Sequence, residues 1–102
     1  MLAILSDRYY ISSNRESGEG RFDIQLEPKD KSQLGYIIEF KAGKNLSDTE
    51  LANSASSAIQ QIQSKKYSTD MDHHGIKKIG LFGIAFSGKR VAAKYEEIQL
   101  HS

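Results

Sequence analysis

The sequence predicts a single α/β domain: a mixed β-sheet of about five strands flanked by a helix. Three observations predict it. Residues 21–27 alternate apolar and polar side chains, residues 48–66 place apolar side chains at helical spacing, and residues 76–86 form a nearly continuous apolar stretch. A chain of 102 residues is long enough for one small domain and too short for two. We therefore expect residues 1–102 to form one unit.

Three strands are expected before the helix. The first covers residues 8–13, and the glycine-containing segment 17–20 follows as a turn, because glycine readily adopts positive φ. The second strand covers residues 21–27 and ends at Pro28, which cannot donate a backbone hydrogen bond to a neighbouring strand. The third covers residues 34–41.

The helix is predicted by a cap and by an apolar stripe. Ser47 or Asp48 can cap its first turn, which contains Glu50, and it continues to about Lys66 or Tyr67. The stripe consists of five residues at helical spacing: Leu51, Ala55, Ala58, Ile59 and Ile62.

Two strands are expected after the helix. Residues 76–86 form a strand buried in the sheet, a tight turn lies at Ser87-Gly88, and residues 89–95 form the last strand. We read His73-His74 as a helix end before Gly75, and residues 96–102 as a polar tail.

Composition excludes several classes of protein. Apolar content of 38% and charged content of 26% are typical of globular proteins, and no segment approaches the roughly 20 apolar residues of a membrane-spanning helix. The chain has no cysteine, which excludes a disulfide framework and a thiolate zinc site. Without a recognisable secretory signal, we expect a cytoplasmic location. The net charge of +1 means that nucleic-acid binding requires local clustering of the 14 Lys and Arg residues.

The most informative chemical pattern is Glu39-Phe40-Lys41 within an apolar strand. Alternate side chains of a strand share a face, so Glu39 and Lys41 lie on the same side of the sheet. Asp23 lies on the preceding strand, and an aspartate followed by Glu-x-Lys on the next strand is the layout of a magnesium-dependent phosphodiesterase site. The alternative is an exposed ion pair on an edge strand, with Asp23 as one more surface carboxylate.

These residues divide the work of phosphodiester hydrolysis. Asp23 and Glu39 supply carboxylate oxygens for Mg²⁺ or Mn²⁺, and the backbone carbonyl of Phe40 can supply a third oxygen. Lys41 lies where it can polarise the attacking water or hold the phosphate.

The segments around this pattern resemble the PD-(D/E)XK nuclease superfamily over most of the chain. Residues 13–24 resemble its glycine-rich turn and first aspartate, residues 37–41 its Glu-x-Lys element, residues 58–67 its following helix, and residues 83–89 its closing hairpin. The chain looks most similar to the nuclease-like domain found C-terminal to AAA-type ATPase-like domains in bacterial proteins. The resemblance implies a restriction-endonuclease-like fold and metal-dependent cleavage of nucleic acid, most simply DNA.

The resemblance also assigns supporting residues. Gln61 and Tyr67 match positions that help to arrange the metal site or the DNA in some members; the alternative for Gln61 is a polar residue at the edge of the buried helix face. Lys65 and Lys66 are candidates for phosphate contacts, or else part of a solvated charged face. We expect the aromatic residues of the strands to lie in the core rather than to stack on bases: Tyr9, Tyr10, Phe40, Phe82 and Phe86.

One departure from the family pattern concerns its first helix. Only residues 1–7 can correspond to that helix, which also often carries an acidic residue of the site. We therefore expect an apolar sheet face to need another partner, and we predict a homodimer; the alternative is a chain of only marginal stability. The alternative to an enzyme is a catalytically inactive nuclease-like binding module of a larger ATPase-like protein.

Overall fold

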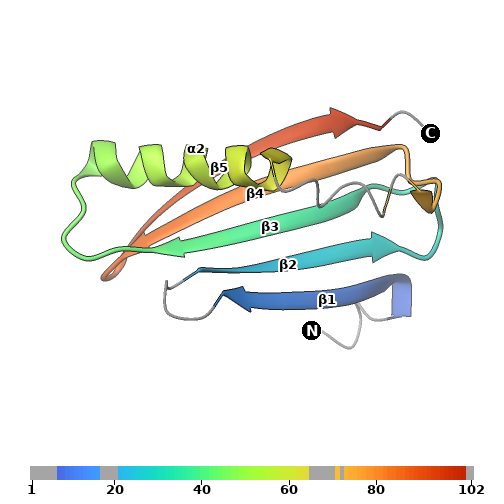
Figure 1. The fold of residues 1–102 in the computed structure, drawn as a ribbon, viewed down its shortest axis with the longest axis horizontal. Helices are drawn as coiled ribbons and strands as arrows, with labels where there is room; N and C mark the ends of the chain where they lie inside the picture. Colours follow the sequence, from blue (N-terminus) through green and yellow to red (C-terminus); the bar gives the residue numbers. More distant parts are fainter. Residues whose placement is uncertain (1–6, 17–20, 65–70, 72, 101–102) are drawn as a thin grey trace.

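The computed structural model describes residues 7–16, 21–64, 71 and 73–100. These residues form five strands and a long helix (Figure 1). In chain order the elements are β1 (Tyr9–Glu16), β2 (Arg21–Pro28), β3 (Gly35–Ala42), α2 (Asp48–Ser64), β4 (Lys78–Ser87) and β5 (Arg90–Gln99). The α/β class and the mixed five-stranded sheet predicted from the sequence are confirmed.

The strands form one sheet in the order β1-β2-β3-β4-β5. Three of the strand pairs are antiparallel, and β3 pairs with β4 in parallel. Parallel neighbours require a crossover connection, and α2 lies within it. The helix contacts β4, β5 and β3, and in Figure 1 it lies across β4 and β5 while β1 and β2 extend beyond it.

The helix begins as its sequence predicts. Ser47 Oγ accepts a hydrogen bond from the Glu50 backbone N–H (3.1 Å), and Glu50 Oε1 accepts one from the Ser47 N–H (2.9 Å). This reciprocal capping box satisfies two backbone donors that the helix itself leaves unbonded. None of the helices in the described part of the chain is long and apolar enough to cross a membrane.

Side-chain alternation separates the two faces of the sheet. The face covered by α2 contains most of the core, in which Ile37, Ile79 and Leu81 pack against Ile59 and Ile62 of the helix. We call the other side the open face, because α2 does not cover it. Its side chains in the middle of the sheet are half-buried. It contains Ile24, Leu26, Tyr36, Ile38, Phe40, Phe82, Ile84 and Phe86, with Ile11, Val91 and Tyr95 on the outer strands.

Close packing of α2 on the sheet depends on Gly83. A Cβ atom added there would overlap the Ala55 carbonyl oxygen and come within 3.0 Å of Ala58 Cβ. Only glycine allows the helix backbone to approach β4 this closely. Gly83 is paired with Glu39 in the β3–β4 register, so the closest helix–sheet contact lies beside that glutamate.

Some expected boundaries differ from the structure. The last strand continues to Gln99, past the predicted end at Tyr95, because Ile98 packs against the core and prolongs the pairing with β4. Residues 96–99 are therefore strand, not polar tail. The fourth strand begins at Lys78, two residues later than expected. The helix end before Gly75 is confirmed, with Gly75 at a φ of 90° and the Ile76 N–H donating to the Met71 carbonyl oxygen.

The aromatic residues that we expected in the core lie elsewhere. Tyr10 is 63% exposed, and Tyr9, Phe40, Phe82 and Phe86 are half-buried. The apolar pattern of a strand does not reveal which of the two sheet faces a helix will cover. Residues 1–6, which belong to the predicted remnant of a first helix, lie outside the described residues.

Candidate active site

Asp23 of β2 and Glu39 of β3 are directly opposite each other in the antiparallel register. Their side chains lie on the face that α2 covers and are almost completely buried, with relative exposures of 1% and 2%. Directly opposite residues have Cβ atoms about 5 Å apart, so both carboxyl groups can reach one small ligand. The exposed edge-strand pair considered for Glu39 does not fit its position, because β3 is the central strand.

Lys41 follows Glu39 by two residues on the same strand and is half-buried. Two residues of β-strand span about 6.6 Å, so Lys41 shares the face of Glu39 and lies nearer the end of β3. The Lys41 side chain is the more accessible part of the group, whereas the two carboxylates lie deeper. The Phe40 side chain lies on the open face, and only the Phe40 backbone is available to the carboxylate side.

Two neighbouring ionised carboxylates in a protein interior repel each other, and positive charge nearby offsets this repulsion. Lys41 supplies one such charge in the same region. A divalent cation with hard oxygen ligands would supply another, and the donors present suit Mg²⁺, which keeps several waters and needs only one or two carboxylates.

The residues available for metal binding are few. In the segments that the structure describes, no group of three or more His, Cys, Asp or Glu side chains is placed to hold a metal ion. A cation at this site would therefore be held by Asp23, Glu39, the Phe40 carbonyl oxygen and water. These oxygen donors suit Mg²⁺ or Mn²⁺. They do not suit a structural zinc ion, which is bound mainly by nitrogen and sulfur ligands.

Gln61 lies on α2 near this region. It follows Ala58 by three residues and so shares a helix face with it, and Ala58 packs at Gly83, the β4 partner of Glu39. Gln61 is half-buried, and its amide oxygen Oε1 is fully enclosed, as is Oε2 of Glu39. Its position suits the supporting role that the resemblance implies, although that role stays a prediction.

Three of the predicted supporting residues are not placed. Tyr67, Lys65 and Lys66 lie outside the described residues, so their predicted roles at the metal or the phosphate stay as expectations.

Two structural relationships, one beside the site and one away from it, were not predicted from the sequence. Gly83 admits the α2 backbone beside Glu39, and a glycine inside a buried strand is the signal that could have indicated this contact. His74 Nδ1 lies 2.9 Å and 3.0 Å from the two carboxylate oxygens of Glu27 at the far end of β2. The residues of this pair are 47 positions apart, and no local pattern joins them.

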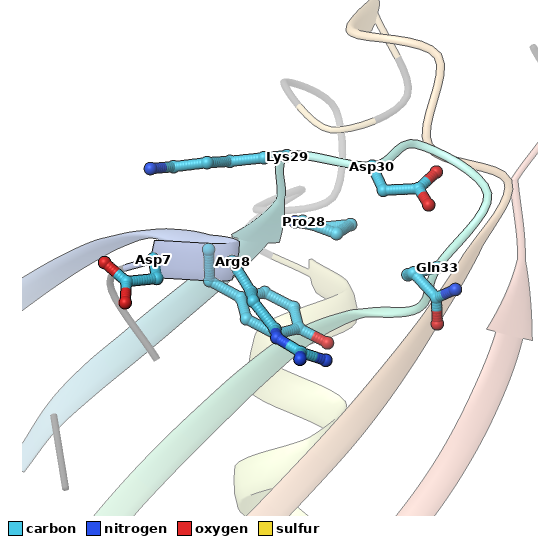
Figure 2. A pocket seen from close by; sticks show the side chains of 7 residues that line it. Asp7, Arg8, Pro28, Lys29, Asp30 and Gln33 are labelled. Carbon is cyan, nitrogen blue, oxygen red and sulfur yellow. The ribbon is translucent and has the colours of Figure 1, made fainter. Parts of the chain in front are cut away.

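A surface cleft of about 390 Å³ lies at the opposite end of β2 from Asp23 (Figure 2). Its lining includes Pro28, five residues along the strand from Asp23, or about 17 Å at 3.4 Å per residue. Charges of both signs surround it, and the side chains of Lys29 and Asp30 point in opposite directions (Figure 2). This cleft is therefore separate from the paired carboxylates.

Comparison with models of known protein families places the chain in a superfamily. The model of the PD-(D/E)XK nuclease superfamily matches residues 1–96. The chain belongs to this superfamily, whose members typically use Mg²⁺ and act on nucleic acid. Searches of curated proteins and of solved structures found no match to the chain.

Proposed function

We propose that the chain is a Mg²⁺- or Mn²⁺-dependent nuclease that hydrolyses phosphodiester bonds of DNA. The observation that carries this proposal is the placement of Asp23 directly opposite Glu39, with Lys41 next on the same face. Superfamily membership over residues 1–96 supports the reaction class. The roles of the three residues and the choice of DNA are parts of the proposal.

Each side chain has a distinct role in this reaction. Asp23 and Glu39 hold the cation, which when bound neutralises charge on the scissile phosphate and favours hydroxide formation from water. Lys41 carries its charge nearer the protein surface, where it orients the attacking water or binds a phosphate oxygen. The Gln61 amide, on α2, helps to hold the metal site in position.

Cleavage of DNA tests the proposal directly. Purified protein is incubated with supercoiled plasmid, linear duplex and single-stranded DNA, with Mg²⁺, with Mn²⁺ or with EDTA. We expect cleavage with either metal and none with EDTA, and loss of cleavage in Glu39→Gln. Glu96→Gln is the matched control, because Glu96 is an exposed glutamate on β5. Absence of cleavage on all three substrates by correctly folded protein would contradict the proposal.

A second candidate function is a nuclease-like binding module of a larger ATPase-like protein. The burial of Asp23 and Glu39, at 1% and 2% exposure, favours this alternative, because a scissile phosphate must reach groups that are nearly inaccessible. Two measurements separate the two functions. A binding module retains DNA or protein binding after Glu39→Gln and shows no metal-dependent cleavage before it.

We also propose that the protein acts as a homodimer. Support for this part comes from the apolar side chains of the open face.

A further inference from the structure

The open face carries apolar side chains on every strand of the sheet, with Ser13 on β1 and Glu97 and Gln99 on β5 as polar positions at its margins. Its side chains come from all five strands, whereas α2, the long helix in the described part of the chain, packs on the other face. The outer positions are well exposed: Ile11 on β1 by 38%, Val91 on β5 by 57% and Tyr95 on β5 by 47%. A contiguous apolar surface of this kind is uncommon on a monomer and is typical of an interaction site.

Aromatic rings form a row across this face. Tyr9, Tyr36, Phe82 and Tyr95 lie on β1, β3, β4 and β5, with successive ring centroids 6.3, 6.2 and 4.6 Å apart. Gly80 leaves room for this row, because a Cβ added there would lie 2.7 Å from the Tyr95 hydroxyl oxygen and 2.9 Å from Tyr36 Cδ1. The four rings together extend across the width of the sheet. Aromatic side chains are enriched at the centres of protein interfaces.

The size of the open face agrees with what a dimer needs. Five strands about 4.8 Å apart and eight residues long cover roughly 600 Å². Two copies packed together would bury about 1,200 Å² in total, at the lower end of stable, specific interfaces. The sheet faces of two domains pack well at about 10 Å separation, as in a β-sandwich.

We propose that the open face binds the open face of a second copy of this chain, giving a two-fold dimer of stacked sheets. A two-fold axis brings the same surface of both copies together, so one apolar face is sufficient to build the interface. In this arrangement α2 and the paired carboxylates Asp23 and Glu39 lie on the two outer sides of the dimer. The assembly does not depend on the proposed nuclease activity, and a failure of one leaves the other intact.

Two charge substitutions on opposite edges of the face test the dimer. Val91→Glu and Ile11→Glu each place a carboxylate at an exposed position of the open face. Lys94→Glu is the matched control, because Lys94 is also exposed on β5 but projects from the other face. Sedimentation equilibrium over a range of micromolar concentrations gives the dimer dissociation constant, and circular dichroism reports whether each variant is folded.

We expect the wild-type chain to be dimeric at micromolar concentration. Each open-face variant should raise the dissociation constant by more than about tenfold, and Lys94→Glu should leave it unchanged. A folded wild-type monomer over the whole range would overturn the proposal. A dimer that both folded open-face variants retain would also overturn it, because association would then use another surface, such as the edge of β5. If one variant does not fold, the other still decides between these outcomes.

Discussion

The Ala55 carbonyl oxygen of α2 occupies the space where a side chain at Gly83 of β4 would begin. This contact fixes how closely the helix approaches the sheet, and it lies beside Glu39, the β3 partner of Gly83. The position of the helix and the position of a proposed metal ligand are therefore coupled.

Gly83→Ala should destabilise the fold and disturb the site together. The added methyl group overlaps backbone and must displace α2, at an expected cost of about 1–3 kcal/mol in the free energy of unfolding. Urea denaturation measures this cost, and Mn²⁺ titration should show weaker binding in the folded variant. Gly88→Ala is the control: its φ of 62° costs about 1 kcal/mol, but the site is undisturbed. Equal Mn²⁺ affinity in Gly83→Ala and wild type would disprove the coupling.

Asp23→Asn and Glu39→Gln should each weaken divalent-metal binding. Loss of one charged ligand from a cation that has few others is expected to lower Mn²⁺ affinity by more than about tenfold, or about 1.4 kcal/mol. Calorimetric titration with Mn²⁺ measures the affinity. Thermal unfolding gives a second readout, because a metal that binds only the folded chain raises Tm. Asp30→Asn, at an exposed aspartate, should behave as wild type; an unchanged affinity in Asp23→Asn would remove Asp23 from the site.

Lys41→Ala should separate metal binding from cleavage. The ammonium group acts on water or phosphate and is not a metal ligand, so the cleavage rate should fall by about 10²–10³-fold while Mn²⁺ affinity stays near the wild-type value. Single-turnover cleavage and metal titration give the two quantities. Lys44→Ala provides the comparison at an exposed lysine just beyond β3. A parallel loss of metal affinity would assign Lys41 a structural role instead.

Ser47→Ala should destabilise α2 and reduce the dependence of stability on pH. Loss of the cap is expected to cost about 1 kcal/mol. The Ser47 backbone N–H, and then its hydroxyl, lower the pKa of Glu50 below its usual value. A lowered folded-state pKa contributes stability above the unfolded-state pKa, which is lost as pH falls through the folded value. Urea denaturation between neutral and acidic pH should show a smaller acid loss in Ser47→Ala, with Thr49→Ala as control; an identical pH dependence would contradict this account.

The sequence was sufficient to predict those parts of the fold that depend on local chemistry. Pro28 ended β2 and Ser47 with Glu50 began α2, because caps and breakers act within a few residues. The Glu-x-Lys spacing also predicted that Glu39 and Lys41 share a face, since alternation is a property of the backbone, whereas the position of Asp23 opposite Glu39 comes from the register of β2 and β3. Their catalytic roles stay predictions.

Other features depend on contacts between distant segments and could not be predicted in this way. Strand β5 runs through Glu96 and Glu97 because Ile98 packs on the core and holds the strand against β4. Phe82 and Phe86 were expected in the core, yet they lie on the open face because their β4 positions point away from α2. Local apolar patterning identifies a strand without indicating which face its neighbours will cover.

Successive side chains of β3 lie on opposite faces of the sheet, so neighbouring residues are under different structural constraints. Ile38 and Phe40 belong to the open face, whereas Glu39 and Lys41 belong to the opposite face. Substitutions at Glu39 or Lys41 therefore leave the apolar side chains of the open face in place, and changes at Ile38 or Phe40 leave the charged groups in place. If the proposed catalysis and the proposed dimer are both correct, a single codon change at Glu39 or Lys41 removes the first and keeps the second, and conservation among relatives should fall into two independently varying sets of alternate positions.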